Sequence, residues 1–220
     1  MFERTRDLTE AGLFIDRVTI ALEGREIVSL TRRVAPGGVL TVMGPSGAGK
    51  STLLAYIGGF LDPVFSARGR VFVDGTEVTA LKPEDRHVGV LFQDPLLFPH
   101  MSVGGNLMFA LPEAVRGRAA RAERVAQALE GVGLAGLEAR DPATLSGGQK
   151  ARVALARVLA SSPRALLLDE PFSKLDAELR AQTRELVFSK ACDSGLPVLL
   201  VTHDEADAEA AGGDIVRIGA

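Results

Sequence analysis

Residues 39–52 read Val-Leu-Thr-Val-Met-Gly-Pro-Ser-Gly-Ala-Gly-Lys-Ser-Thr, and this stretch decides the fold. It opens with apolar and β-branched residues, which predict a buried strand over Val39–Met43. The strand pattern breaks at Gly44, and residues 44–51 then match the pattern G-x-x-x-x-G-K-[ST]. After Ser51 apolar residues recur at helical spacing. The sequence therefore predicts strand, glycine-rich loop and helix in succession, the context in which this pattern forms a phosphate-binding loop.

The loop has the composition that phosphate binding requires. Glycines let the backbone turn its N–H groups inward, and the helix that follows adds the positive end of its dipole. We expect the Lys50 ammonium to reach the β- and γ-phosphates of a nucleotide and the Ser51 hydroxyl to bind Mg²⁺. The candidate nucleotide-binding residues of this loop are Gly44, Pro45, Ser46, Gly47, Ala48, Gly49, Lys50, Ser51 and Thr52.

Composition limits the classes of function. A chain of 220 residues suits one large or two small domains, and its net charge of −3 offers no basic field for nucleic acid. The longest apolar runs, such as residues 196–201, are far too short to span a bilayer. Residues 1–10 are charged and lack the apolar region of a signal peptide, and the single cysteine excludes an internal disulfide. We expect a cytosolic protein, with any membrane part supplied by another subunit.

Helical and strand-like segments alternate along the chain, which favours an α/β sheet covered by helices. Strands are predicted at 13–20, 26–34, 39–43, 70–73, 88–92, 165–168, 197–201 and 214–218, and helices after Ser51 and at 121–132, 150–160 and 177–191. Strand patterns are missing between residues 95 and 161. We interpret residues 1–220 as a single domain with an α/β core, 13–94 and 162–220, and an inserted helical subdomain, 95–161.

Two adjacent carboxylates, Asp169 and Glu170, follow the apolar strand predicted at 165–168. The carboxyl end of a strand is where an α/β sheet places its ligand groups. Asp169 would hold Mg²⁺ through its ligand shell, and Glu170 could orient or deprotonate an attacking water. An acidic pair after a strand is weak evidence for function by itself.

The segment Leu145-Ser-Gly-Gly-Gln149 stands directly before a predicted helix. Ser146 is a plausible N-cap, and the two glycines expose backbone N–H groups at the helix start. The segment therefore has two interpretations, a second anion site or an ordinary cap with a glycine hinge. The residues alone leave both open.

Two further side chains follow predicted strands. Gln93 offers a neutral amide that could ligate Mg²⁺ or a water, and His203 could contact a γ-phosphate. A single histidine after a strand is more often structural, and we give that interpretation to His87 and His100. No spacing of histidine and cysteine suggests a zinc site.

Together these segments resemble the ATP-binding subunits of ABC transporters, over nearly the whole chain and in the order of that family. The corresponding motifs are the Walker A loop 44–51, the Q-loop Gln93, the signature 145–149, the Walker B strand ending at Asp169, the catalytic Glu170, the D-loop 173–176 and the switch His203.

The resemblance implies a P-loop NTPase core of the RecA type with an N-terminal antiparallel β subdomain and an inserted helical subdomain. It implies an ATPase that binds ATP with Mg²⁺ and forms a head-to-tail homodimer, in which the Walker A loop of one subunit and the signature of the other enclose each ATP. The implied catalytic residues are Glu170, His203, Gln93 and Lys50; the implied metal ligands are Ser51, Gln93 and Asp169; and Ser146, Gly147, Gly148, Gln149 and Asp176 would face the partner's nucleotide.

Within this family the chain is similar to the importer type. Residues 93–103, Gln-Asp-Pro-Leu-Leu-Phe-Pro-His-Met-Ser-Val, are similar to a stretch of bacterial importer ATPases, thiamine-type subunits among them. The type implies integral membrane permease subunits as partners, a periplasmic or lipoprotein substrate-binding protein, and a location at the inner face of the cell membrane. The apolar residues 96–101 need either the core or such a partner, and no residue identifies the substrate.

The chain departs from the family pattern at a few positions. An aromatic residue usually stacks on adenine, and the corresponding position falls near Leu22. Lys174 stands where alanine is common, Ala151 replaces a polar residue after the signature, and Gly105 replaces a glutamate.

Two other classes of function remain as alternatives. A soluble ABC-type ATPase acting on nucleic acid or protein complexes would favour a basic groove or a coiled-coil insertion. A P-loop kinase or GTPase would leave the signature segment unexplained.

Overall fold

The computed structural model describes residues 11–219. The charged segment 1–10, in which we expect no signal peptide, lies outside the described residues. The chain divides into two compact units. The core unit comprises residues 11–90, 164–170 and 188–219 of the described part, and the helical unit comprises 91–163 and 171–187. The predicted division into 13–94 with 162–220 and 95–161 stays a prediction about functional subdomains.

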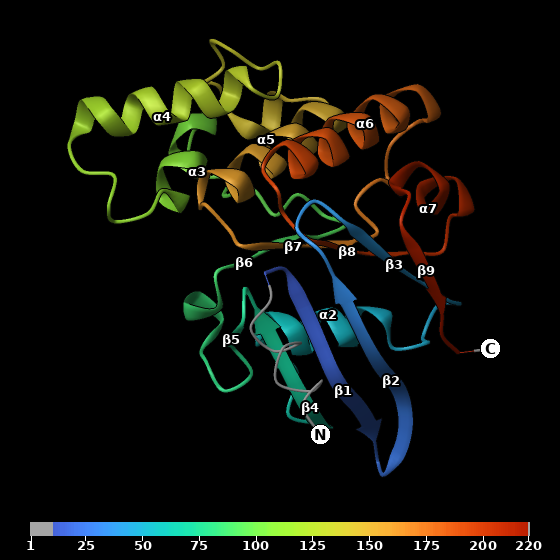
Figure 1. Ribbon diagram of the computed structural model, residues 1–220. Helices are drawn as coiled ribbons and strands as arrows, with labels where there is room; N and C mark the ends of the chain where they lie inside the picture. The colour runs from blue at the N-terminus through green and yellow to red at the C-terminus, as the bar shows by residue number, and fades with distance from the viewer. Residues whose placement is uncertain (1–10, 220) are drawn as a thin grey trace. The chain divides into compact units, whose positions relative to one another are not determined.

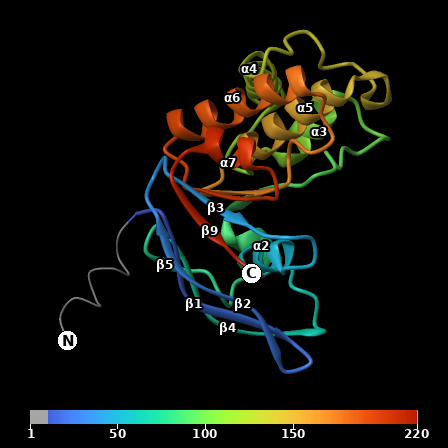
Figure 2. The same cartoon turned by 90° about the vertical axis from the view of Figure 1, so that its right-hand side faces the viewer.

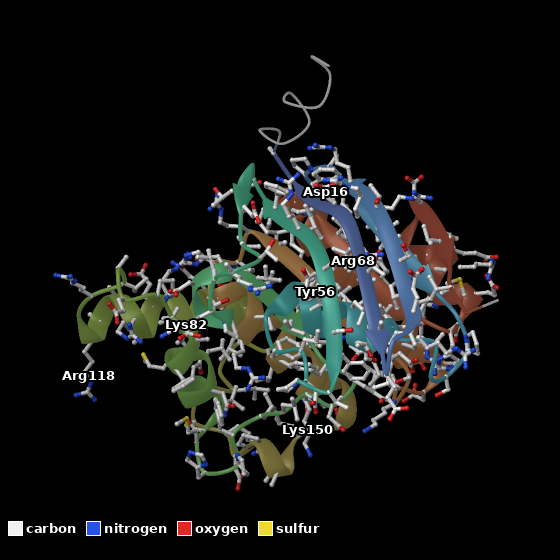
Figure 3. The ribbon with its side chains drawn as sticks, turned by 90° about the horizontal axis from the view of Figure 1, so that it is seen from below. Asp16, Tyr56, Arg68, Lys82, Arg118 and Lys150 are labelled. Carbon is white, nitrogen blue, oxygen red and sulfur yellow. The ribbon has the colours of Figure 1, made fainter. Side chains whose placement is uncertain are left out.

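An antiparallel sheet forms one side of the core unit (Figure 1). Its strand order is β2-β1-β4-β5, with β1 Leu13–Leu22, β2 Arg25–Val34, β4 Phe65–Val73 and β5 Thr76–Glu77. Alternate residues of β1 point into the core, and a bulge between Ile15 and Val18 shifts this alternation by one residue. Figure 3 shows β1, β2 and β4 side by side, with Asp16 and Arg68 labelled.

A second sheet has the strand order β6-β7-β8-β3-β9. Its members are β6 Val88–Leu91, β7 Ala165–Asp169, β8 Val198–Thr202, β3 Val39–Met43 and β9 Asp214–Arg217. β3 runs parallel to both β8 and β9, and β7 runs parallel to β8. The central strands are near-continuous apolar runs because both of their faces are buried. The parallel register places the carboxyl ends of β3, β7 and β8 at one edge.

Helix α2, Lys50–Gly58, joins the two sheets of the core unit through one hydrophobic core. The buried side chains of α2 are Leu53, Leu54 and Ile57, which confirms the helix predicted after Ser51. They pack in one cluster with residues of β1, β2, β3, β4, β7 and β8. Figure 2 shows α2 beside β3. The helix that begins at the phosphate loop is therefore anchored to both sheets through its buried face.

The helical unit contains α3 Val103–Ala110, α4 Arg118–Glu130 and α5 Gly147–Ala160, and α6 Ala177–Asp193 begins in it. α3, α4 and α5 pack against one another (Figure 2). Short 3₁₀ turns, η1 Pro83–Arg86 and η2 Pro142–Thr144, precede β6 and α5. Helix α7, Glu205–Ala211, lies in the core unit against β8 and β3. Among the described residues, no helix is both long and apolar enough to cross a bilayer.

The fold class is the predicted one, but some element ends differ from the prediction. α4 ends at Glu130, before Gly131 and Gly133, so Val132 is buried outside the helix that we expected to contain it. β4 begins at Phe65 rather than Arg70, because residues 65–68 also pair with β1 although residues 66–68 are exposed.

The helices α3 and α7 and the strand β5 were missed. In α3 the pair Gly104-Gly105 conceals the helical pattern, and the helix depends instead on the Ser102 side chain, which accepts a hydrogen bond from the Gly105 N–H.

Candidate nucleotide-binding site

The phosphate loop connects β3 to α2 through two glycines in the left-handed conformation. Gly47 has φ 82° and Gly49 has φ 85°, a region that other residues rarely adopt. At Gly49, which caps α2, a Cβ atom would also lie 2.6 Å from a methyl carbon of Val28. The loop can therefore curl closely around the N-terminus of α2, where the unpaired N–H groups favour an anion.

The Lys50 side chain lies beneath this loop, with only 6% of it exposed. Its ammonium donates hydrogen bonds to the carbonyl oxygens of Gly44 at 2.8 Å and Pro45 at 2.9 Å. It also lies 3.9 Å from Oε1 of Glu170. A fixed positive charge inside a curled loop is the arrangement that suits a polyphosphate.

Ser51 and Asp169 meet at the same edge of the sheet although 118 residues separate them. The Ser51 hydroxyl donates to Oδ1 of Asp169 at 2.9 Å. Burial raises the pKa of Asp169; the Ser51 hydrogen bond opposes this rise and the charge of Glu170 adds to it. A hydroxyl and a carboxylate are hard oxygen ligands of the kind that Mg²⁺ prefers, so these residues fit the ion.

The described residues contain no cluster of three or more His, Cys, Asp or Glu side chains that could hold a metal.

Glu170 follows β7 in a left-handed conformation, φ 45°, which is uncommon for a residue with a side chain. Its N–H donates to the Val201 carbonyl at 2.9 Å, which holds this turn against the end of β8. Oε1 of Glu170 lies 3.1 Å from Nδ1 of His203 and 3.9 Å from the Lys50 ammonium. The carboxylate is therefore held beside the phosphate loop, between His203 and Lys50.

A cavity of about 540 Å³ opens beside Gly47 and Ala48 of the phosphate loop. Its other lining residues are Leu22, Glu23, Arg25, Glu26, Ile27 and Gly219. None of these lining residues is aromatic. Leu22 itself stands near the position where the family usually has the aromatic residue that stacks on adenine. The cavity adjoins the phosphate loop and offers no aromatic ring on which a base could stack.

The signature segment forms the start of α5 in the helical unit. The Ser146 hydroxyl accepts from the Gln149 N–H at 3.3 Å, and Oε1 of Gln149 accepts from the Ser146 N–H at 3.0 Å. This reciprocal cap confirms Ser146 as the N-cap. The N–H groups of Gly147 and Gly148 stand in the first turn, where a helix offers them no partner.

The two glycines of the signature differ in their surroundings. A Cβ atom at Gly148 would lie 2.3 Å from a methyl carbon of Leu179, so any larger residue there would force the Leu179 side chain of α6 to shift. At Gly147 a Cβ atom would meet nothing within 4 Å. Gly147 therefore leaves open space at the start of α5, next to N–H groups that can bind an anion.

The remaining predicted residues also lie in the helical unit. Gln93 is exposed and follows β6. Asp176 accepts a hydrogen bond from the Leu179 N–H at 3.0 Å, so it caps the start of α6 whatever else it does. The structure thus brings Lys50, Ser51, Asp169, Glu170 and His203 together in the core unit, while Gln93, Asp176 and the signature belong to the helical unit.

Arg157 was missed as a residue that supports the site. From α5 it donates to the carbonyl oxygens of Leu96 at 2.7 Å and Pro95 at 3.0 Å, and its guanidinium lies 5.5 Å from the centre of the Phe98 ring. Burial lowers the pKa of Arg157. It fixes the loop that follows Gln93 to the signature helix. A charged residue within the apolar pattern of 150–160 was the available signal.

Comparisons with known proteins agree with this geometry. A family described as ABC transporter matches residues 27–173. The ABC transporter ATP-binding protein YnjD of Escherichia coli (strain K12), described as uncharacterized, is 47% identical over 90% of this chain and 91% of its own length. The thiamine import ATP-binding protein ThiQ of Cereibacter sphaeroides is 45% identical, covering 89% of this chain and 83% of its own.

Other relatives are longer than this chain. The chain spans 62% of the Fe(3+) ions import ATP-binding protein FbpC 1 of Haemophilus influenzae, to which it is 40% identical. Among solved structures, the ATP-binding cassette MJ0796 is 27% identical with a TM-score of 0.77, covering 94% of both chains. MJ0796 was solved as a dimer in a post-hydrolysis state bound to ADP and Pi.

Proposed function

The chain belongs to the ABC transporter family, and from that premise we propose that it is the subunit that energises a bacterial solute importer. It binds ATP and is an ATPase. The geometry that supports the assignment is the meeting of Lys50, Glu170 and His203 at the mouth of the phosphate loop. Those three groups offer a cation for phosphate, a base for water and a group that holds the base.

The residues of the core unit divide the work of hydrolysis. The N–H groups of the loop and the Lys50 ammonium bind the phosphates, so Lys50 leaves the carbonyl oxygens of Gly44 and Pro45 for a phosphate oxygen. Ser51 and Asp169 would hold Mg²⁺, which when bound neutralises charge on the β- and γ-phosphate oxygens. Glu170 orients or deprotonates the attacking water, and His203 keeps its carboxylate in place.

A head-to-tail homodimer accounts for the two anion-binding helix starts in one chain. The start of α2 lies in the core unit, and the start of α5 lies in the helical unit. In a dimer the signature residues, Ser146 to Gln149, close over the nucleotide of the partner, and Asp176 lies at the seam. The dimeric state of MJ0796 supports this arrangement.

The membrane partners follow from the importer type. Import functions are named for ThiQ and FbpC, which supports permease subunits as the partners of this chain. Those partners would hold it at the inner face of the cell membrane, with a periplasmic or lipoprotein protein delivering the solute. The import function named for the relatives and the net charge of −3 both disfavour the alternative, an ATPase that acts on nucleic acid. The residues described above do not indicate which solute is transported.

The test is the substitution Glu170→Gln. Because glutamine keeps the shape but cannot act as a base, turnover should fall by at least about 100-fold, within the range that general-base catalysis contributes. ATP binding should persist, so ATP-bound dimers should accumulate in size-exclusion chromatography with ATP and Mg²⁺. The matched control Glu209→Gln removes an exposed carboxylate on α7 and should hydrolyse ATP at the wild-type rate. Wild-type turnover in Glu170→Gln, or its failure to dimerise, would contradict the assignment.

A further inference from the structure

Asp94 and Lys174 form an ion pair between two loops of the helical unit. The Lys174 ammonium donates to Oδ1 of Asp94 across 80 residues of sequence. Asp94 directly follows Gln93, and Lys174 precedes Asp176 by two residues. The pair therefore links the loop of Gln93 to the loop of Asp176. Both side chains stay exposed, Lys174 at 51% and Asp94 at 63%.

The loop of Gln93 is fixed on its other side by α5. Arg157 donates to the carbonyl oxygens of Pro95 and Leu96, the two residues that follow Asp94. The loop of Asp176 is fixed by its own cap, because Asp176 accepts from the Leu179 N–H at the start of α6. Each loop thus has a rigid attachment to a helix, and the ion pair joins one loop to the other.

A cavity of about 130 Å³ lies between these loops and α5. Its lining is mostly apolar, and the apolar side chains come from Leu91, Phe92, Pro95, Ala151, Ala154, Pro171 and Leu175. Gln93 and Lys174 also line it. Ala151 contributes only a methyl group to the lining, at a position where the family usually has a polar residue. The cavity therefore separates the two loops at this point. Two of the residues that line it, Ala151 and Lys174, depart from the family pattern.

We propose that Asp94 and Lys174 are positioning residues, which make the loops of Gln93 and Asp176 move as one body. The inference rests on the proposed function, since both loops serve ATP in it. Neither residue needs to touch the nucleotide. An exposed ion pair shifts a two-state equilibrium by at most about fivefold, and salt weakens it. The coupling is consequently modest and sensitive to ionic strength.

Hydrogen exchange on the nucleotide-free chain tests the coupling without any catalytic readout. Lys174→Ala and Asp94→Asn should each raise amide exchange about two- to fivefold in both loops, residues 92–97 and 172–177. The double variant should exceed neither single variant, because both remove the same interaction. The matched control Lys82→Ala removes an exposed lysine of the core unit and should leave both loops unchanged. Exchange that rises only in the mutated loop, or additive effects, would overturn the proposal.

A charge exchange supplies the second measurement. The variant Asp94→Lys with Lys174→Asp should restore slow exchange, whereas loss of structure at either position would persist in it. In ATPase assays Lys174→Ala should lower kcat about two- to fivefold with KM unchanged, and kcat should lose its dependence on salt between about 0.05 and 0.5 M. Uncoupled exchange in an active ATPase refutes only this inference. Coupled loops in a chain without ATPase activity refute the proposed function instead.

Discussion

The Asp169 carboxylate lowers the stability of the folded chain, but it offers a ligand for a cation. Burial raises its pKa, so the folded chain holds the ionised form at a disadvantage. The Ser51 hydrogen bond and the Lys50 ammonium offset part of that disadvantage. A divalent cation would remove the rest, since it favours the charged carboxylate. Asp169 thus favours the binding of a cation and lowers the free energy of unfolding of the chain that has none.

We predict that Asp169→Asn stabilises the nucleotide-free chain at pH 7. A raised pKa means that the folded state binds a proton more readily than the unfolded state, so stability falls as the pH rises from 3.8 through the raised value. Asparagine keeps the acceptor for Ser51 without the charge, and the melting temperature should rise by about 2–4 °C. The gain should vanish near pH 3, and magnesium-dependent hydrolysis should be lost. Scanning calorimetry across pH checks it, and a lower melting temperature at pH 7 would contradict it.

The cavity beside the phosphate loop predicts weak discrimination between bases. A stacking aromatic is worth about 1–3 kcal/mol per base, and the lining around Leu22 has none. Most affinity then comes from phosphate contacts that are identical in ATP and GTP. We expect kcat/KM for GTP within about tenfold of that for ATP, a difference of about 1.4 kcal/mol. Leu22→Tyr should tighten ATP binding. A preference for ATP above about a hundredfold would show that the base is read elsewhere.

At the scale of elements, α2 and α5 are both helices that begin at an anion site, but they are stabilised differently. α5 has its own reciprocal cap of Ser146 and Gln149. α2 has no side-chain cap, and its C-terminal carbonyl groups, those of Tyr56 and Ile57, accept hydrogen bonds from the buried Arg86 guanidinium. Burial lowers the pKa of Arg86, while its charge complements the negative end of the helix. The phosphate-binding helix therefore depends on tertiary contacts.

Substitutions at Ser146 separate the cap of α5 from the function of the signature. Ser146→Ala removes the cap, so it should cost about 1 kcal/mol and lower the melting temperature by about 2–4 °C. Ser146→Arg should abolish hydrolysis but leave ATP binding to the monomer intact, because the phosphate loop lies in the core unit. Ser146→Thr retains a capping hydroxyl and serves as the control. If Ser146→Arg bound no ATP as a monomer, the signature would belong to its own chain's site.

At the scale of the whole molecule, the apolar residues 96–101 divide between packing and exposure. The Phe98 ring lies 5.0 Å from the Phe109 ring and beneath Arg157, so it supports the helical unit. Leu96 is 57% exposed although it is apolar. The segment therefore serves both interpretations that the sequence left open, with Phe98 half-buried against Phe109 and Arg157 and Leu96 available to a partner.

We expect Leu96→Asp to impair assembly with the permease or transport, while ATPase activity and melting temperature stay near wild type. Phe98→Ala should lower the melting temperature as well, since it leaves Phe109 and Arg157 without their contact. Ile215→Asp, at an exposed apolar position of the core unit, is the control and should leave assembly intact. Transport in reconstituted vesicles measures the effect. Unimpaired transport in Leu96→Asp would exclude this loop as the docking site.

The sequence by itself determined the phosphate loop, the cap of the signature helix and the order in which the motifs follow the apolar strands along the chain. These features are local: a strand, a glycine turn and a helix start are encoded within about ten consecutive residues, and apolar runs identify buried strands without knowledge of their neighbours. The roles of Glu170, Gln93 and His203 were suggested by their positions after strands, and that of Asp176 by the resemblance alone; all four stay predictions.

Only the tertiary structure decided which side chains meet. The pairing of Ser51 with Asp169 spans 118 residues, and that of Lys174 with Asp94 spans 80. The parallel register sets the first pairing, and loop packing sets the second. The helix α3 was hidden for the same reason, since its glycine pair opposes helical propensity and the buried Asn106, which accepts from the Phe98 N–H, holds the loop against it. Contacts between residues that are distant in the sequence leave no periodic pattern in the sequence. Where local propensity and tertiary packing favour different conformations, the energy of packing outweighs the propensity.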